Sequence, residues 1–567
     1  MKKYISFILL FILSSNVFSQ STVTHNRVIV REGLYLKDTW IDSIQRAGDF
    51  TSNRTVPTSK AVADYIKSFP QIWLSITDFG VKADDTLTDY TAKIQEGLSS
   101  GAKLLVFPPG RYIVTTPLLV NSNTTIFGYG ATLIRKAAID NMLRNNADGV
   151  TGGYTANENI HFYGLIIDGN KTSYPGNCTS VAIGHAQKLF FKDCEFRGIA
   201  GAWHGLELNA CQDVLIEGCY FHDGTGQEHL QLDLAGGPAL FPWFGPVDFT
   251  PCNNIIINGN LFTNGTSAGV GSHSGGDSYQ HYNIVISNNT FKNFGTGNAI
   301  NMYNYRNLTI TGNIVDGCGV GITAYRTGVA GVENWVISNN QFTNVTNGAL
   351  NLFNIKGITI SNNIINKVGQ FGVSIQTSNN VTISGNIIKN AGQSISADYG
   401  GLEMVNDTNV YVVNNTFLKD PAGFNSGVYT IKATTINGAT IENNTLSTPG
   451  AAATFTPFTG MGLKVGINTI NGVTTPGIIS KTSNYTCVAT DGVVNVDATS
   501  GNITITVNPG IFNKGGLTVR KISADANTVT ILPSTGTING AASITLTTQN
   551  QTALIKSDWV NLDAIII

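Results

Sequence analysis

Acidic and histidine side chains gather in one short region of a chain that is otherwise poor in ionisable groups. Charged residues make up only 12% of the sequence, yet seven of the eight histidines lie within residues 161–281. Glu207, Glu228, Asp233 and His273 fall in the same stretch. Hydrolysis of a glycosidic bond requires a pair of carboxyl groups, one protonated and one ionised or acting as nucleophile. The sequence therefore predicts a catalytic cluster of these four side chains.

The ionisable cluster lies inside a sequence repeat. Segments such as QDVLIEGCYF from Gln212, NNIIINGNLF from Asn253 and NNVTISGNII from Asn379 recur, with most starts 23 to 29 residues apart. Each repeat combines two short alternating stretches with a turn at an Asn or Gly pair, which is typical of strands stacked on copies of themselves. Equivalent residues then lie about 4.8 Å apart. The sequence predicts an all-β fold, a right-handed parallel β-helix, over residues 71–450.

One turn position carries asparagine or cysteine in successive repeats. The residues at this position are Cys194, Cys219, Asn260, Asn289, Asn313, Asn340, Asn363, Asn386, Asn415 and Asn444. Stacked amides can hydrogen-bond along such a column. We therefore expect an asparagine ladder in which Cys194 and Cys219 are stacked thiols and not a disulfide.

Alignment of the second strand of each repeat predicts which side chains share an outward face. When Leu206, Leu230 and Val270 point inward, their neighbours form two outward columns. The first column holds Glu207, Gln231, Gly271, Asn301 and Thr323, and the second holds Asn209, Asp233, His273, Tyr303, Tyr325 and Phe353. Carboxylates and histidines lie at one end of this strip and aromatic side chains at the other.

The strip is expected to bind sugars. The one long interval between repeats includes residues 224–252 and supplies Trp243. Sugar rings stack on aromatic faces while polar groups orient their hydroxyls. His204 and Glu228 fall together at the start of the strands, and His229 is expected to face outward. The expected substrate-binding residues are His204, His229, Gln231, Trp243, Asn301, Tyr303, Tyr325 and Arg326.

Three kinds of function fit this strip. In a glycoside hydrolase, which we favour, Glu207 and Asp233 have Cα atoms about 8 Å apart and supply the carboxyl pair, with Glu228 as a third candidate. In a metal-free polysaccharide lyase, His273 or Tyr303 would remove the proton next to a uronic carboxylate. In a non-catalytic adhesin or tail fibre, the strip would only bind a glycan. No cofactor is expected, and no metal, because the cluster lacks any recognised zinc spacing.

The start of the predicted solenoid resembles that of a known group. Within residues 76–114, the motif DFG at 78–80, Asp84 and Asp89 precede a predicted helix, and FPPGRY at 107–112 follows it. This arrangement is similar to that of the pectate-lyase-like superfamily, which includes rhamnogalacturonase-type and phage tailspike proteins. The resemblance implies a right-handed β-helix that acts on polysaccharides and, from the tailspikes, a side-by-side homotrimer. It does not select among hydrolases, lyases, epimerases and binding proteins.

The ends of the chain lack the repeat. Residues 1–19 resemble a secretory signal peptide, because two lysines precede a short apolar run and small residues follow it. Residues 20–70 are expected to be an N-terminal attachment region and 451–481 a linker. Alternating stretches separated by turn signals predict a C-terminal antiparallel, sandwich-like β module over 482–567.

Charge and targeting signals narrow the partners. A formal net charge of −2 gives no electrostatic case for nucleic acid. After removal of the signal peptide, no remaining segment is long and apolar enough to span a bilayer. We expect a secreted or cell-surface protein, with a phage virion tail as the alternative, whose substrate is a polysaccharide.

Overall fold

The computed structural model describes residues 73–567 with short gaps, and four two-residue strands near the N-terminus. The gaps are 237–242, 274–278, 326–332, 395–398, 420–428, 448–452, 456–462, 471–472, 476, 489–490, 510–515 and 559. The predicted signal peptide and Arg326 lie outside the described residues. Within the predicted attachment region, β1 (Val23–Thr24) pairs antiparallel with β2 (Arg27–Val28), and β3 (Tyr35–Leu36) with β4 (Thr39–Trp40).

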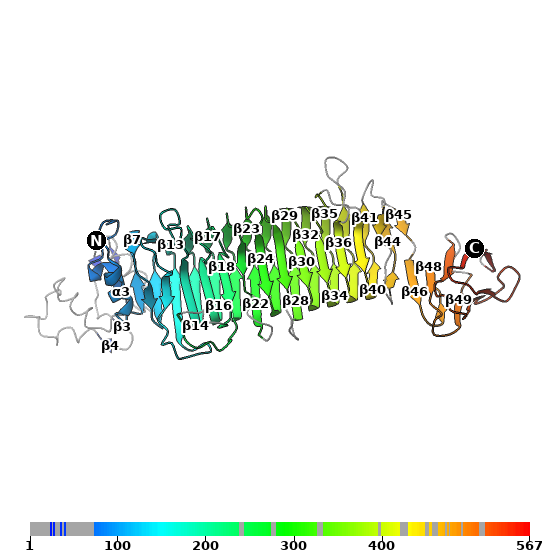
Figure 1. The fold of residues 1–567 in the computed structure, drawn as a ribbon, viewed down its shortest axis with the longest axis horizontal. Coiled ribbons are helices and arrows are strands. Elements are labelled where there is room, and N and C mark those ends of the chain that lie inside the picture. The colour runs from blue at the N-terminus through cyan, green and yellow to red at the C-terminus, as the bar shows by residue number, and fades with distance from the viewer. Residues whose placement is uncertain are drawn as a thin grey trace, which may run out of the picture. The chain divides into compact units, whose positions relative to one another are not determined.

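Each turn of the solenoid contains three short extended segments separated by bends. In one turn, β16 (Leu206–Glu217) bends at Ala210, which has a φ of +50°, and β17 (Tyr220–His222) follows Gly218, which has a φ of +65°. The next turn begins with β18 (Leu230–Asp233). Left-handed residues at such corners let the chain change direction between extended segments. Figure 1 shows the resulting stack of strands.

The strands of the solenoid form two long sheets. The third segments build a 15-stranded sheet. Its strands are β7 (Gly110–Val114), β10 (Ala131–Arg135), β13 (Ile166–Asp168), β15 (Glu195–Arg197), β17, β20 (Leu261–Thr263), β23 (Thr290–Lys292), β26 (Ile314–Asp316), β29 (Gln341–Val345), β32 (Ile364–Val368), β35 (Ile387–Ala391), β38 (Thr416–Leu418), β41 (Thr445–Ser447), β44 (Asn468–Ile470) and β45 (Val473–Thr475). The first and second segments belong to a second, larger sheet.

Within the larger sheet, the first segments of successive turns pair with one another. These strands are β8 (Leu118–Val120), β11 (Asn141–Asn145), β14 (Thr179–Lys192), β16, β18, β21 (Ala268–Gly271), β24 (Asn298–Tyr303), β27 (Val320–Tyr325), β30 (Leu350–Phe353), β33 (Val373–Gln376), β36 (Gly400–Val405), β39 (Tyr429–Thr434) and β42 (Ala453–Phe455). The second segments are β6 (Leu104–Val106), β9 (Thr124–Phe127), β12 (Asn157–Tyr163), the later parts of β14 and β16, β19 (Asn253–Asn258), β22 (His281–Ser287), β25 (Tyr305–Thr311), β28 (Glu333–Ser338), β31 (Lys356–Ser361), β34 (Asn379–Ser384), β37 (Thr408–Val413), β40 (Asn437–Glu442) and β43 (Leu463–Val465).

Pairing in the solenoid is parallel and in the predicted register. Leu206 pairs with Leu230, Leu230 with Val270, Val270 with Ile300, and Ile300 with Ile322. These five side chains are at most 1% exposed and belong to one continuous core. Each such burial contributes roughly 1.5–3 kcal/mol. The predicted β-helix and its strand alignment are therefore confirmed.

The predicted asparagine ladder is present and buried. At a representative step, the side-chain amide of Asn313 donates to Asn340 Oδ1 at 2.9 Å, and its backbone N–H donates to the same oxygen at 2.9 Å. The ladder continues one step beyond the prediction to Asn468, the acceptor for Asn444. All seven cysteines are free and buried, which confirms the expectation that Cys194 and Cys219 are thiols.

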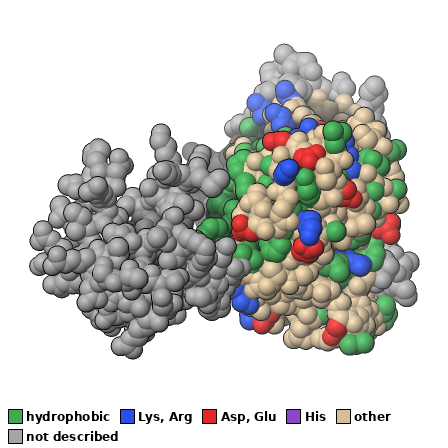
Figure 2. Space-filling model, turned by 90° about the vertical axis from the view of Figure 1, so that its left-hand side faces the viewer, with side chains coloured by type: hydrophobic (Ala, Val, Ile, Leu, Met, Phe, Trp, Pro, Cys, Tyr) green, Lys and Arg blue, Asp and Glu red, His purple; other side chains and the backbone are tan. Residues whose placement is uncertain are grey.

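A short N-terminal segment closes the first turn of the solenoid. Helix α3 (Thr91–Ser99) buries Ile94 and Leu98 against the core. Asp84 Oδ1 accepts from the backbone N–H of Arg111 at 3.1 Å, which links the motif before the helix to β7 after it. β5 (Trp73–Ser75) and the 3-10 helix η2 (Ile76–Phe79) precede this helix. Figure 2 shows the N-terminal end, where acidic and basic side chains are interspersed with apolar and uncharged ones.

Parallel pairing continues past residue 450. β42, β43 and β44 pair in parallel with the preceding turn, within the stretch predicted to be a linker. The sequence predicted an antiparallel module for the next strands, but they form a mixed one. β46 (Gly477–Lys481), β48 (Asp491–Val496) and β50 (Leu517–Lys521) pair in parallel, as do β47 (Tyr485–Thr486), β49 (Ile503–Val507) and β51 (Val529–Pro533). The antiparallel pairs join β50 to β53 (Thr552–Ser557), β53 to β54 (Leu562–Ile566), and β51 to β52 (Ile544–Leu546).

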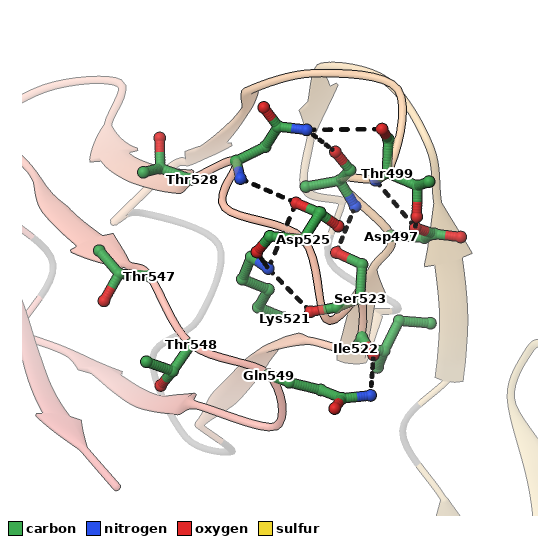
Figure 3. Close-up of polar contacts among 12 residues, drawn as sticks. Asp497, Thr499, Lys521, Ile522, Ser523, Asp525, Thr528, Thr547, Thr548 and Gln549 are labelled. Carbon is green, nitrogen blue, oxygen red and sulfur yellow. Dashed lines mark hydrogen bonds and ion pairs between the residues drawn. The ribbon is translucent and has the colours of Figure 1, made fainter.

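Side chains also bond to the backbones of turns in this module. The ammonium group of Lys521, which is fully buried, donates to the carbonyl oxygens of Ser523 at 2.7 Å and Asp525 at 2.9 Å. Figure 3 shows the Lys521 side chain bonded to Ser523 and Asp525. The Asn527 side chain donates to the carbonyl oxygen of Ala498 at 2.8 Å and so joins two turns. Period-2 alternation predicts strands but not the direction in which they pair, so the sequence pattern could not distinguish parallel from antiparallel pairing here. No helix in the described part of the chain is long and apolar enough to cross a membrane.

Candidate functional site

The candidate site lies on the outward face of the first segments of successive turns. Glu207 on β16 pairs with Gln231 on β18, Gln231 with Gly271 on β21, and Gly271 with Asn301 on β24. The first predicted column is therefore confirmed. In the second column, Asn209 pairs with Asp233, and Tyr303 with Tyr325. Strands β16, β18 and β24 lie close together in Figure 1.

The long interval after β18 packs beside this face. The backbones of Ala235 and Phe249 bond to each other, which closes the segment into a loop. Phe244 is fully buried in a small cluster with Ala182 and Ala210. A Cβ at Gly184 would lie 2.3 Å from the Phe244 ring, so the ring occupies the space that a side chain at position 184 would need. Phe244 thus forms a wall beside Glu207 and Asn209, whose pairing partners on β14 are residues 182 and 184.

Glu207 is a buried carboxyl group with a raised pKa. It is 6% exposed; its Oε2 accepts from the Thr179 hydroxyl at 3.0 Å and its Oε1 from the Asn209 amide at 2.9 Å. Burial, and after it the negative charge of Asp233, raise its pKa to about 7. The two hydrogen bonds oppose this shift but do not cancel it. Glu207 therefore holds a proton across much of the pH range in which an ordinary glutamate is ionised.

Asp233 has the opposite electrostatic setting. Its Oδ1 accepts from the Gln231 amide at 2.9 Å and from the backbone N–H of His273 at 3.0 Å, and its Oδ2 lies 2.8 Å from His273 Nδ1. Burial works against ionisation, but the hydrogen bonds and charge of His273 outweigh it and lower the pKa of Asp233. The same ion pair raises the pKa of His273 to about 9. A protonated imidazole cannot accept a proton, which argues against His273 as the base of a lyase.

Glu228 and His204 form a second buried pair beside the first. Glu228 Oε2 lies 3.5 Å from His204 Nδ1, and both side chains are less than one-tenth exposed. The His204 ring lies 5.9 Å from the His273 ring, so the two pairs adjoin. Burial lowers the pKa of His204, which favours its neutral form. The predicted cluster of Glu207, Glu228, Asp233 and His273 is thus assembled on one face, together with His204.

His229 is not part of this face, and the sequence prediction for it is wrong. Its side chain is fully buried and packs against Phe294, with ring centroids 5.2 Å apart. A Cβ on Gly224 or Gly265 would meet its ring, and burial lowers its pKa to about 3. The strand starts only at Leu230, so outward alternation does not extend back to His229. The orientation of this residue is set by packing in the loop and not by the alternation of the strand.

Aromatic side chains border the site. The Trp243 ring lies 5.7 Å from the Trp203 ring in an edge-to-face arrangement, and both are half-buried. On the later strands, Tyr325 pairs with Phe353, which is 38% exposed. The predicted binding residue Arg326 lies in the undescribed segment 326–332.

Two contributors were not singled out from the sequence. Thr179 bonds to Glu207 from a preceding turn, and Trp203 contacts Trp243 from the position next to His204. The aromatic residue beside His204 was a usable signal. Thr179 was not, because a threonine before a strand carries no chemical signature. Within the described residues, no group of three or more His, Cys, Asp or Glu side chains is placed to hold a metal ion.

These features define a right-handed parallel β-helix protein with an ionisable cluster on one outward face. The chain belongs to the right handed beta helix region family, which it matches over residues 167–334 and 328–491. No curated protein matches the sequence.

Solved structures with this fold come from proteins of different kinds. Pre-mature gene product 12 of bacteriophage phi29 is 16% identical with a TM-score of 0.51, over 85% of this chain and 69% of that one. The surface adhesin PfbA of Streptococcus pneumoniae is 15% identical with a TM-score of 0.45, over 87% and 98%. A family 28 exopolygalacturonase of Yersinia enterocolitica is 13% identical with a TM-score of 0.43, over 70% and 78%. At these identities the likeness concerns the fold alone.

Proposed function

We propose that this protein is a polysaccharide depolymerase, a glycoside hydrolase in which Glu207 is the general acid and Asp233 the ionised partner. The observation that carries the proposal is that their surroundings shift the two carboxyl groups in opposite directions. The pKa of Glu207 rises to about 7, whereas that of Asp233 falls. Two carboxyl groups with separated pKa values are what glycosidic hydrolysis needs.

The residues divide the reaction between them. Glu207 donates its proton to the glycosidic oxygen as the bond to the anomeric carbon breaks. Asp233 either accepts a proton from the water that attacks that carbon, or attacks it directly to give a glycosyl ester that water then hydrolyses. In the retaining course Glu207 recovers its proton from the water that hydrolyses the ester, so both carboxyl groups return to their starting states. In the inverting course Glu207 ends ionised and Asp233 protonated, and proton exchange with solvent restores the pair. The His273 imidazolium contacts Asp233 Oδ2, its backbone N–H donates to Oδ1, and together they keep this carboxylate ionised.

The first test is a screen of neutral and acidic polysaccharides for new reducing ends and for the ultraviolet absorbance of unsaturated uronates. A hydrolase releases reducing ends without that absorbance. Glu207→Gln and Asp233→Asn should each lower the rate by roughly 10²–10⁴-fold. The anomeric configuration of the first product, followed by NMR, distinguishes the inverting course from the retaining one. Absorbance that appears with cleavage and is lost in Tyr303→Phe would establish the lyase instead.

One observation favours a second function, glycan binding without cleavage. Every oxygen of Glu207 and Asp233 already accepts a hydrogen bond within the protein, and these residues are 6% and 2% exposed. A binding protein would retain glycan affinity in Glu207→Gln and Asp233→Asn and would release no reducing ends from any polysaccharide. The same screen, read by pull-down on insoluble glycans, separates the two functions.

The setting of this activity is part of the proposal. The secretory pattern of residues 1–19 supports a secreted or cell-surface protein acting on a surface, capsular or cell-wall glycan, with a virion tail as the alternative. Light scattering of the full-length protein tests the homotrimer that the tailspike resemblance implies. Western blotting of the culture medium and cell fractions tests the location.

A further inference from the structure

Buried polar atoms around Gly271 lack hydrogen-bond partners among the described residues. Gln231 and Asn301 flank Gly271 in one column, and Gln231 Oε1 and Asn301 Oδ1 are both unpartnered. Glu228 Oε2 and His204 Nδ1 lie 3.5 Å apart as a pair, but neither atom makes a hydrogen bond. A buried polar atom without a partner is destabilising, and native proteins rarely keep several together unless a ligand or water satisfies them.

The glycine itself shapes this cluster. A Cβ at position 271 would lie 2.3 Å from Glu228 Cγ and 3.1 Å from its Cδ. The Glu228 side chain therefore lies over Gly271, in the place where every other residue type would put a side chain. This position brings the Glu228 carboxylate into the same face as Gln231 and Asn301.

The free atoms are mostly acceptors. The amide nitrogen of Gln231 donates to Asp233 Oδ1, which leaves its carbonyl oxygen as the unpartnered atom. Similarly, the amide nitrogen of Asn209 donates to Glu207 and its Oδ1 is unpartnered. The unpartnered Glu228 atom is a carboxylate oxygen. A lining of this kind binds a ligand that is rich in donors, as sugar hydroxyls are.

We propose that this cluster, which we call the Gly271 subsite, binds one neutral hexose unit of the glycan through its hydroxyl groups and discriminates against uronic acids. The proposal rests on the proposed action on glycans and names the substrate class. A uronate carries a carboxylate, which has acceptors only and a negative charge, and it would face the acceptor oxygens of Glu228, Gln231 and Asn301. Among the described residues, the ion-pair partners of Glu228 and Asp233 are the histidines His204 and His273, and neither carboxyl group pairs with a lysine or arginine.

The subsite adjoins both solvent and the proposed catalytic pair. The His273 side chain is 37% exposed, and its ring lies 5.9 Å from the His204 ring. Asp233 and His204 both lie next to the exposed His273 ring, and Glu228 lies next to His204. Binding here would place one ring of the chain beside the bond that Glu207 and Asp233 act on.

Matched ligand pairs test the discrimination on the full-length protein. Saturation-transfer NMR would be recorded with D-glucose against D-glucuronate and with D-galactose against D-galacturonate, which differ only at C6. We expect at least one hexose to bind, and its uronate to bind roughly tenfold more weakly or not at all. Equal or stronger binding of both uronates, or no binding of any of the four sugars, would overturn the proposal.

Two variants test whether the hexose binds at the Gly271 subsite. Gly271→Ala displaces only the flexible Glu228 side chain, whereas Gly176→Ala is a matched control because nothing lies within 4 Å of its added Cβ. Glu228→Gln tests the same contact without added volume. Both Gly271→Ala and Glu228→Gln should weaken hexose binding about tenfold while Gly176→Ala does not. Unchanged hexose binding in Glu228→Gln would reject the subsite even if Gly271→Ala failed to fold.

The binding measurement does not require cleavage, so the two proposals can fail separately. Hexose binding at the Gly271 subsite without release of reducing ends from any polysaccharide would leave the subsite standing and reject the hydrolase. Cleavage that depends on Glu207 and Asp233 but accepts uronic and neutral glycans equally would leave the hydrolase standing and reject the subsite.

Discussion

His273 contacts both oxygens of the Asp233 carboxylate, its backbone N–H reaching Oδ1 at 3.0 Å and its ring Nδ1 lying 2.8 Å from Oδ2. The two residues are forty positions apart in sequence, and the stacking of β21 on β18 brings them together. The long interval between these strands therefore does not disturb the register that builds the pair. His273 thus orients the Asp233 carboxylate together with Gln231, which donates to Oδ1, and the charge of His273 favours the ionised form of Asp233.

Replacement of His273 by glutamine should raise the pKa of Asp233 and weaken the fold. The acid limb of the pH–rate profile should move to higher pH, and kcat should fall by roughly tenfold to a hundredfold. Because the pKa of His273 is raised to about 9, its contribution to stability is complete below pH ~6.5 and is lost as the pH rises through about 9. Urea unfolding should show a larger loss of stability at pH 6 than at pH 10. His222→Gln, which breaks a histidine–carboxylate pair outside the site, is the control and should leave the profile unmoved.

Activity should decline above neutral pH. Cleavage by the proposed mechanism requires protonated Glu207, whose pKa is raised to about 7. We expect an alkaline limb in kcat/KM with a midpoint near this value, measured as reducing-end release on the polysaccharide found in the screen. An alkaline limb that persists unchanged in Glu207→Asp would assign the limb to another group.

Glu207→Gln should abolish cleavage and stabilise the fold. Burial raises the pKa of this carboxyl above that of an unfolded glutamate. Wild-type protein therefore loses stability between pH ~4.5 and about 7, because the unfolded chain releases the proton in this range while the folded state retains it. The glutamine variant avoids this loss and should be more stable at pH 8 by on the order of 3 kcal/mol, with little difference at pH 4. Thermal unfolding of both proteins at the two pH values measures this difference in stability. Equal stability at pH 8 would mean that the pKa of Glu207 is not raised in the folded state.

Gly184→Ala should displace the insertion beside the site. Its Cβ would lie 2.3 Å from the Phe244 ring, so the ring and the neighbouring Trp243 must move. We expect a loss of roughly 1–3 kcal/mol and a change in the near-ultraviolet circular dichroism of the Trp203–Trp243 pair. Gly176→Ala serves again as the control. An unchanged tryptophan signal would show that the loop tolerates the added methyl.

Asn340→Ala should destabilise the solenoid far more than a change on the exposed surface. Its amide donates to Asn363 Oδ1 and to the carbonyl oxygen of Ile310, and its Oδ1 accepts from Asn313, all in the buried ladder. Loss of these bonds should cost about 2–4 kcal/mol in chemical unfolding. Asn334→Gly removes an exposed stacking bond at a left-handed residue and should cost less than about 1 kcal/mol. Equal losses would place the strength of the stack in its core and not in the ladder.

The period of the sequence was sufficient to predict the fold and the register of the site. Inward aliphatic residues and the Asn column recur at fixed positions, so Leu206, Leu230 and Val270 could be aligned without a structure. The neighbours Glu207, Gln231 and Asp233 follow from that alignment by alternation alone. The repeat fails where the chain leaves the strands, and His229 is the example, because packing against Phe294 fixes its orientation.

Burial was the property that the sequence could not give. Outward residues of a sheet are ordinarily solvated, yet Asp233 is 2% exposed and Gln231 is fully buried. Part of this burial comes from tertiary packing, because Phe244 and Trp243 belong to a loop whose path no local pattern determines. The pKa of Glu207 and its opposition to Asp233 depend on that burial, so the strongest functional signal became readable only in three dimensions.

The asparagine ladder also has a mechanical consequence. Its amides, like the backbone bonds of both long sheets, join each turn only to the turns before and after it. A tension applied across the stack is therefore carried by successive interfaces in series, and the weakest one yields first. Under load the protein should come apart one turn at a time, as a sawtooth of small force peaks, and the turns that carry Glu207 and Asp233 should survive the loss of turns at the ends.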